Sequence, residues 1–211
     1  MKNKFYLIVI FSFAFLINLN GKSYSNDILI DAETVDIKEK GNLIFATGKV
    51  NIRDGTGAVI KGDKAIYNKY NQSVEISGNV FFLDNIKNFN ISSDKVFFER
   101  QKSKISTFDN TIINFLDQNN EKIEFEIKGK NSIFDQKKKI LEINEDVILL
   151  DLINNYQIYS QKIIYDIRNE LIKSQNKTEI NFKNKVNIIS SDIIYKKKIA
   201  VFETKKDTIL K

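Results

Sequence analysis

The chain has 211 residues and a formal net charge of +6; 42% of its residues are hydrophobic and 28% are charged. This balance is typical of a globular chain and excludes both a disordered tail and a bundle of membrane helices. The sequence contains no Cys, His or Pro. Disulfide frameworks, thiolate nucleophiles and histidine-dependent triads are therefore excluded, and the usual ligands of transition metals are missing. We expect neither a metal nor a cofactor.

Residues 1–25 have the features of a secretory signal peptide. Two lysines precede the apolar run 5–19, and the small residues Ser23 and Ser25 stand just before a cut at Asn26. The apolar run is shorter than the ~20 residues of a spanning helix, which favours cleavage over an uncleaved anchor. A chain exported in this way would act in the periplasm of a bacterium with two membranes.

Cleavage would leave residues 26–211, which we expect to form one domain. It would remove three of the 33 Lys and Arg residues and none of the 27 Asp and Glu residues, lowering the formal net charge from +6 to +3. A net charge of +3 is too small to indicate a nucleic-acid partner. It suits an anionic lipid or glycan, or simply a solvated Lys-rich surface.

A unit of about thirty residues then recurs six times along the chain. Two copies are KGDKAIYNKYNQSVEISGNV at 61–80 and KGKNSIFDQKKKILEINEDV at 128–147. The anchor positions of the six units lie 30, 31, 36, 31 and 31 residues apart: Glu33, Asp63, Asp94, Lys130, Gln161 and Asp192. Such a period predicts a repeat architecture. Because Asp63 becomes Lys130, a catalytic or metal-binding role shared by both copies is excluded.

Each unit contains two short runs rich in Val, Ile, Phe and Tyr, separated by a polar turn. In the second run apolar residues alternate with polar ones, as in Val74, Ile76, Gly78, Val80 and Phe82. The same pattern occurs elsewhere: Ile44, Ala46, Gly48, Val50 and Ile52, and then Leu141, Ile143, Glu145, Val147 and Leu149. A period of two indicates half-buried strands and fails the helical test. The sequence predicts one hairpin per unit, about twelve strands, and no helix.

Gly48 and Gly78 stand on the apolar side of these strands, where Glu145 takes the place of Gly in a later unit. A glycine in mid-strand marks a bend, a bulge or a close approach. Two interpretations stay open: a bend that curves the sheet, or room left for a ligand.

In this register the sequence resembles the OstA-like family, which comprises the periplasmic lipopolysaccharide-transport protein LptA and the N-terminal periplasmic domain of the outer-membrane assembly protein LptD. The match is strongest over residues 28–105 and weaker over 106–211. These segments carry it: Ala32-Glu33-x-Val35-Asp36, Gly41-Asn42, Ala46-Thr47-Gly48-Lys49-Val50-Asn51-Ile52-Arg53, Gly62-Asp63-Lys64-Ala65-Ile66-Tyr67-Asn68 and Gly78-Asn79-Val80.

The resemblance implies an elongated, folded-over antiparallel sheet, called a β-jellyroll or β-taco, with an apolar groove. It also implies a non-enzymatic function: shielding the acyl chains of lipopolysaccharide between the inner and outer membranes. The groove would be lined by the inward residues of the best-matched units. They are Ile44, Ala46, Val50, Ile52, Ile60, Val74, Ile76, Val80 and Phe82. Sequence alone does not separate such a groove from an ordinary packed core.

The resemblance further implies partners. Related jellyroll domains, or further copies of this chain, would join edge to edge by strand addition, so the chain would meet a membrane only through its partners. The candidate edges are 27–31 and 200–203.

Four alternatives remain. The chain could be a truncated LptD without its barrel, an anchored subunit resembling LptC, or a structural β-repeat that stacks in parallel and binds glycans. An enzyme acting through paired carboxylates such as Glu124 with Glu126, or Glu145 with Asp146, is the weakest.

Overall fold

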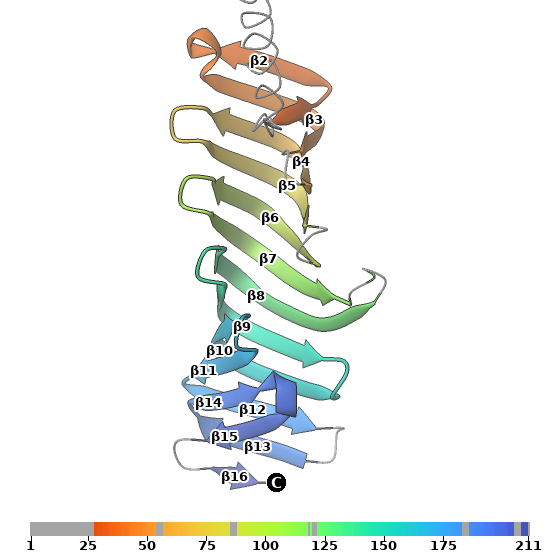
Figure 1. The fold of residues 1–211 in the computed structure, drawn as a ribbon, viewed down its shortest axis with the longest axis vertical. Coiled ribbons are helices and arrows are strands. Elements are labelled where there is room, and N and C mark those ends of the chain that lie inside the picture. The colour runs from red at the N-terminus through yellow and green to blue at the C-terminus, as the bar shows by residue number, and fades with distance from the viewer. Residues whose placement is uncertain are drawn as a thin grey trace, which may run out of the picture.

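The computed structural model consists of one long antiparallel sheet that is folded over along its length (Figure 1). The structure describes residues 28–53, 57–84, 88–117, 119, 122–182, 186–204 and 208–210. The expected all-β, folded-over architecture is confirmed. Neighbouring strands pair antiparallel throughout, so the alternative of a parallel stack of coils is wrong.

Sixteen strands and two short 3-10 turns make up the described chain. The first eight strands are β1 (Leu29–Asp31), β2 (Thr34–Lys38), β3 (Leu43–Arg53), β4 (Ala58–Asn68), β5 (Ser73–Asp84), β6 (Phe89–Glu99), β7 (Lys104–Leu116) and β8 (Ile123–Asp135). The others are β9 (Ile140–Asp151), β10 (Tyr156–Asp166), β11 (Leu171–Gln175), β12 (Lys177–Phe182), β13 (Val186–Ser191), β14 (Ile193–Lys196), β15 (Val201–Thr204) and β16 (Ile209–Leu210). The 3-10 turns are η1 (Glu39–Gly41) and η2 (Lys197–Ile199).

The strands from β3 to β10 pair in chain order, each with the next. This order follows from the hairpin repeat, because each apolar run pairs with the run across the following turn. The one long step of 36 residues in the repeat falls on β7 and β8, which have 13 residues each and are joined by a longer connection.

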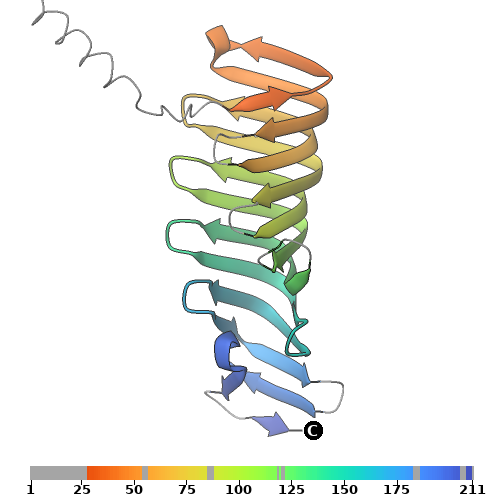
Figure 2. The ribbon, with the colours of Figure 1, turned by 45° about the vertical axis from the view of Figure 1, so that its right-hand side comes forward.

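A bend near the middle of each long strand folds the sheet over (Figure 2). The pairing register shifts at the bend by a β-bulge, which increases local twist and bends the strand. The shifts occur at Thr47/Val50, Lys61/Lys64, Ser77/Val80, Ser92/Lys95, Phe108/Thr111, Lys128/Asn131 and Ser160/Lys162. We call this column of bulges the corner, and the two halves of the sheet on either side of it the first and second walls. The first wall contains β2 and β15, and the second contains β1 and β16.

The number of strands differs from the expected twelve because four strands are broken at the corner. The pairs β1 with β2, β11 with β12, β13 with β14, and β15 with β16 would each be one crossing strand if joined. Asn176 separates β11 from β12 and Asp192 separates β13 from β14, with φ of 67° and 55°. In the middle of the sheet a residue with positive φ only bends the strand. Near the C-terminal end, where the strands have fewer hydrogen-bonded neighbours, Asn176 and Asp192 break the strand in two.

The glycines at the corner confirm the bend and not the space for a ligand. Gly48 and Gly78 have φ of +79° and +80°, a region that L-residues rarely adopt. A Cβ on Gly78 would clash with Oδ2 of Asp63, and one on Gly48 would clash with Glu33. The volume beside each glycine is therefore filled by an anchor carboxylate.

The core is one continuous cluster between the two walls, running from Ala46 to Tyr195. Inward residues from consecutive strands supply it, as the period of two requires. The proposed signal peptide, residues 1–25, lies outside the described residues. Among the described residues, no helix has the length and apolar character needed to cross a membrane.

Candidate functional site

The nine residues predicted to line a groove all project to the inner side of the folded sheet. Eight of them are buried with 5% or less of their surface exposed: Ala46, Val50, Ile52, Ile60, Val74, Ile76, Val80 and Phe82. Ile44 is half-buried. These side chains pack against the opposite wall, so in this state the interior is filled by the chain's own residues.

Aromatic rings close the mouth of the fold, where the free ends of the two walls meet. Phe89, at the start of β6, meets Phe134, at the end of β8, with the ring centroids 5.4 Å apart and an edge-to-face angle of 90°. Phe115 meets Tyr165 in a similar contact at 5.4 Å. Phe125 adds a third ring, 5.5 Å from Tyr165. We call these five residues the aromatic seam; it holds the walls together through side chains.

A pocket of about 340 Å³ opens on the aromatic seam. Phe89, Phe115 and Phe134 form its apolar wall, and Lys139, Ile167 and Arg168 complete its lining. Its volume lies at the lower end of the range for small-molecule sites. The pocket therefore combines an apolar interior with two cations.

The two ends of the interior differ in how far they are closed. At the N-terminal end the inward residues of β2 are open to solvent, with Val35 45% and Ile37 61% exposed. They pair with the inward residues Ala46 and Ile44 of β3, so they continue the same apolar face. At the other end Tyr195 is fully buried.

The closed end is a cluster of rings from several strands. Tyr195 stacks on Phe202 with a centroid separation of 4.3 Å, and Tyr156 packs edge-on against both. The Tyr195 hydroxyl donates a hydrogen bond of 2.7 Å to Oδ2 of the buried Asp151, which lies on β9. Burial, and then this hydrogen bond, raise the pKa of Tyr195 well above its usual range. The C-terminal end is thus sealed by a neutral, hydrogen-bonded tyrosine.

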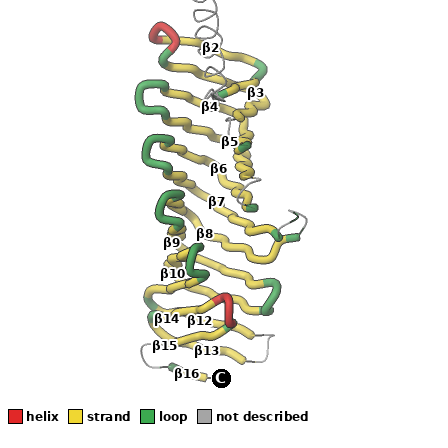
Figure 3. The backbone as a smooth tube through the Cα atoms, in the orientation of Figure 1, coloured by secondary structure: helices red, strands yellow, loops and turns green. Residues whose placement is uncertain are grey.

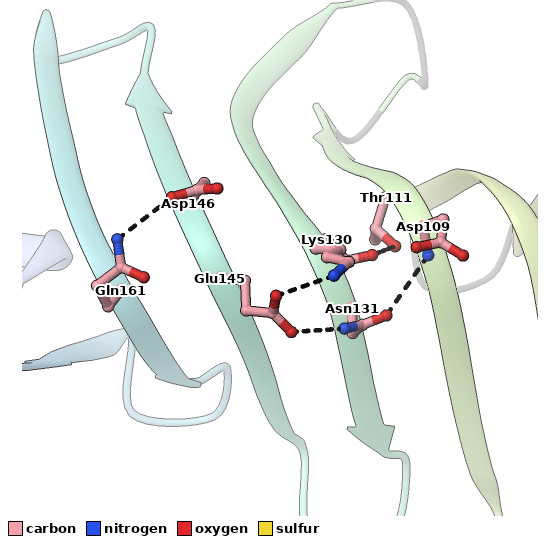
Figure 4. Close-up of polar contacts among 7 residues, drawn as sticks. All are labelled: Asp109, Thr111, Lys130, Asn131, Glu145, Asp146 and Gln161. Carbon is pink, nitrogen blue, oxygen red and sulfur yellow. Dashed lines mark hydrogen bonds and ion pairs between the residues drawn. The ribbon is translucent and has the colours of Figure 1, made fainter.

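A ladder of polar contacts runs along the outside of the corner and includes the repeat anchors (Figure 4). On β5, Asn79 Nδ2 donates to Oδ2 of Asp63 at 3.1 Å. On β9, Glu145 accepts from Lys130 Nζ and Asn131 Nδ2, both at 3.1 Å. The anchor therefore keeps a polar partner on the next strand when Asp63 is replaced by Lys130, although that partner is Glu145, at the position of Gly78, and not the residue at the position of Asn79. This hydrogen bond to Glu145 also raises the pKa of Lys130.

Buried hydroxyls lie on the inner side of the same corner. Thr107 contacts Thr111 at 2.7 Å and Ser132 at 2.8 Å, while Ser93 donates to the carbonyl oxygens of Phe108 and Asp109 at 2.9 Å. These hydroxyls thus provide hydrogen-bond partners to one another and to carbonyl oxygens at the bulges, as buried polar groups require.

The carboxylates considered for glycan chemistry lie on the outer surface, away from the apolar interior. Glu126 forms an ion pair with Lys128 at 2.9 Å, and Asp146 accepts a hydrogen bond from Gln161 at 3.3 Å. Within the described part of the chain, no group of three or more acidic side chains is arranged to hold a metal ion.

The edges of the sheet lie where the sequence predicts them. β1, Leu29–Asp31, falls within the first candidate edge, and β15, Val201–Thr204, overlaps the second. β2 and β16 are edge strands as well, so each end of the molecule presents two short edges. Apolar side chains are exposed there, including Leu29 at 65% and Leu210 at 70%.

Comparison with known proteins gives little beyond these observations. No family model matches the chain, and no curated protein matches its sequence. The chain is similar to a solved structure of LptH from Pseudomonas aeruginosa, described as the LptA homologous periplasmic component of the conserved lipopolysaccharide transport device. The alignment covers 89% of this chain and 97% of that one, with 8% identity and a TM-score of 0.30. A TM-score this low supports no conclusion about function.

Sequence reasoning missed the aromatic seam and the C-terminal cluster. Phe115 and Tyr165 come from strands 50 residues apart in the sequence, and a period of two places them inward without showing that they meet. The signal available was the concentration of aromatic residues at strand ends, as in Phe89, Phe125 and Phe134. Strand ends meet only when the sheet is folded over.

Proposed function

We propose that the chain is a periplasmic carrier that shields the acyl chains of lipopolysaccharide between the inner and outer membranes. The observation that supports this function best is the continuous apolar interior, which is closed along its mouth by side chains. Among the described residues no ladder of backbone hydrogen bonds joins the two free ends of the walls. The walls can therefore part at the aromatic seam without breaking the sheet.

Shielding of this kind needs only an apolar interior and a mouth that opens. Each buried CH₂ group gains ~0.8 kcal/mol, so an acyl chain in the interior is strongly favoured over one in water. An incoming chain replaces contacts between the walls with contacts to itself. The exposed inward face of β2, at Val35 and Ile37, supports an opening at the N-terminal end.

Edge strands would provide the links to partners. An unpaired edge with exposed apolar side chains is an aggregation risk unless another strand covers it. β1 and β2 at one end, and β15 and β16 at the other, suit edge-to-edge addition of a related sheet or of a second copy. Such an assembly would extend the apolar interior from one domain into the next.

Site-specific photocrosslinking tests the carrier function. Phe82 and Phe81 are neighbours on β5 that point to opposite faces, with 2% and 36% of their surface exposed. Each is replaced in turn by p-benzoylphenylalanine, which keeps the phenyl ring, and the purified chain is incubated with lipopolysaccharide. We expect crosslinks from the inner position and none from the outer one. Probes at the inward Ile52 and Val80 should behave like the first.

The outward positions Lys49 and Asn79 serve as further controls. Crosslinks that come only from these and from Phe81 would contradict the assignment of the interior. Circular dichroism of each substituted chain checks that the sheet is intact, so that a missing crosslink can be attributed to binding.

A further inference from the structure

Six turns on the first wall form a basic row along one side of the mouth. They are residues 39–41, 69–72, 100–103, 136–139, 167–170 and 197–199. Together they carry ten Lys and Arg residues and two Glu residues, an excess larger than the net charge of the whole chain. Figure 3 shows several of these turns stacked along one side of the molecule. We call them the basic turn row.

Backbone hydrogen bonds hold these turns in a continuous line. The amide of Ile167 donates to the carbonyl of Lys139, and the amide of Lys197 donates to the carbonyl of Glu170, each at 3.0 Å. Equivalent bonds join the preceding turns: Lys69 to Asn42, Arg100 to Gln72, and Gln136 to Ser103. The spacing of the cations is therefore built into the sheet.

Among the described residues, the other side of the mouth lacks this excess of positive charge. The described residues of the connections at the opposite strand ends are 57, 88, 117, 119, 122 and 152–155, and they contain one lysine and one acidic residue. Over the part of the chain that the structure describes, the mouth is thus positive along one side and neutral along the other. A ligand with one anionic end and one apolar end would be oriented by such an asymmetry.

Three cations of the basic turn row reach the aromatic seam. Lys139 and Arg168 line the pocket formed by Phe89, Phe115 and Phe134. Lys197 places its Nζ atom 5.5 Å from the ring centroid of Phe125, within the range of a cation–π contact.

Within the described part of the chain, none of these three cations forms an ion pair with a carboxylate. The nearby acids are engaged by their own turns. Asp135 accepts hydrogen bonds from the backbone amides of Lys137 and Lys138, and Asp166 accepts from Asn169. These hydrogen bonds hold the pKa of both carboxyl groups below the usual range, so both stay charged but are already satisfied.

We infer that this pocket binds the phosphate group of an anionic amphiphile, with Lys139 and Arg168 contacting the phosphate and the acyl chain entering between Phe89, Phe115 and Phe134. The inference rests on the proposed function and deepens it, because it assigns the headgroup to one side of the mouth. Guanidinium and ammonium groups beside an apolar pocket complement a phosphate that is covalently attached to an alkyl chain.

The test compares two monomeric probes that share one alkyl chain. Binding of dodecyl phosphate and of dodecyl maltoside, each below its critical micelle concentration, is measured by calorimetry on the full chain. We expect the phosphate probe to bind roughly tenfold more tightly at low ionic strength, since two exposed charge contacts contribute about that much. The preference should shrink as salt is added.

Two matched double variants test whether the preference for dodecyl phosphate arises at this pocket. The double variant Lys139→Gln with Arg168→Gln should abolish the preference and leave the maltoside affinity unchanged. The control variant Lys61→Gln with Lys64→Gln removes two exposed cations from the outer face of β4. It should keep the preference for dodecyl phosphate. An equal preference in both variants would overturn the assignment to this pocket.

The remaining outcomes separate this inference from the carrier function. Equal binding of both probes would overturn the phosphate site while leaving the carrier proposal standing. Inorganic phosphate that competes fully with dodecyl phosphate would mean that the pocket recognises a free anion, against the inference. Failure of both probes to bind would contradict the carrier function, and with it the site.

Discussion

At the scale of single residues, the corner pairs show that the repeat maintains a contact rather than a residue type. Asp63 accepts a hydrogen bond from Asn79, whereas Lys130, the anchor of the later unit, donates to Glu145, which stands at the position of Gly78 and not of Asn79. Each pair is exposed, so its energetic value is small. Its importance is to favour one register at the bulge, because a slip by one residue would separate the partners.

Reversing one partner should therefore be harmful, and reversing both should be tolerated. Lys130→Asp places a new carboxylate beside Glu145 and near Asp109 and Asp146, which should lower the free energy of unfolding by about 1 kcal/mol. Adding Glu145→Asn removes this repulsion and supplies an amide that can donate to the new carboxylate, so it should restore most of the lost stability. Urea denaturation of the wild type and the three variants gives the coupling, and strictly additive effects would argue against a contact.

Gly78 should resist substitution for two separable reasons. Its positive φ costs about 1–2 kcal/mol for an L-residue, and its Cβ would crowd Asp63. Gly41 has φ of +92°, but a Cβ added there would have no atom within 4 Å, so Gly41→Ala carries only the first cost. We expect Gly78→Ala to lower the thermal midpoint more than Gly41→Ala does, and equal losses would show that crowding is relieved by movement of Asp63.

At the scale of elements, the strands depend on buried hydroxyls wherever they bend. Thr107 of β7 links Thr111 of the same strand to Ser132 of β8, across the corner. Its hydroxyl also accepts from the amide of Ser132 at 2.9 Å. One side chain thus takes part in three hydrogen bonds at the bend.

Thr107→Val keeps the shape of the side chain and removes these bonds. Because it leaves buried polar groups without partners, the free energy of unfolding should fall by about 1–3 kcal/mol. Thr47→Val makes the same change at an exposed site on β3 and should cost less than about 0.5 kcal/mol. Chemical denaturation measures both, and a loss as small for Thr107→Val as for Thr47→Val would mean that the hydroxyls do not stabilise the bend.

The hydrogen bond between Tyr195 and Asp151 at the C-terminal end should make the stability of the fold depend on pH. The raised pKa of Tyr195 means that its neutral form is favoured in the folded state. The unfolded tyrosine ionises near pH 10, so this contribution is complete below that pH and declines as the pH rises above it. Tyr165, whose pKa is also raised by burial, should act in the same direction.

Tyr195→Phe removes the hydrogen bond to Asp151 and should lower the free energy of unfolding by about 2 kcal/mol at neutral pH. It should also reduce the loss of stability above pH 10. Hydrogen exchange should accelerate in β14 and β15 and stay unchanged in β4 and β5. Tyr159→Phe, which removes a hydrogen bond to Gln157, is the control, and an alkaline profile identical to the wild type in Tyr195→Phe would contradict the assignment.

At the scale of the whole molecule, the sequence was sufficient to predict the sheet, its hairpin order and its inward face. The reason is that a period of two and a repeat length are local properties. Ile76 is predicted to be inward because it stands between the polar residues Glu75 and Ser77, and the structure confirms it. For Gly78 the sequence left a bend and room for a ligand equally open, and only the positive φ in the structure decides for the bend.

The sequence could not predict contacts between the two walls, because these depend on the angle at which the sheet folds over. The contact between Phe89 and Phe134, and the seal formed by Tyr195 with Asp151, join residues more than 40 positions apart. Their meeting is decided by how sharply the corner bends, which no local pattern encodes. For the same reason sequence could not distinguish an open groove from the closed interior that is observed.

The chain-order pairing of the strands has a mechanical consequence. Strands cross the molecule and their hydrogen bonds run along its length, so a force that pulls the two ends apart loads each ladder in the direction of its own bonds. Such a sheet should peel open one strand at a time at low force, whereas a sandwich pulled in shear breaks many bonds together. A chain stretched between two anchored partners would therefore yield gradually from whichever end is gripped less firmly.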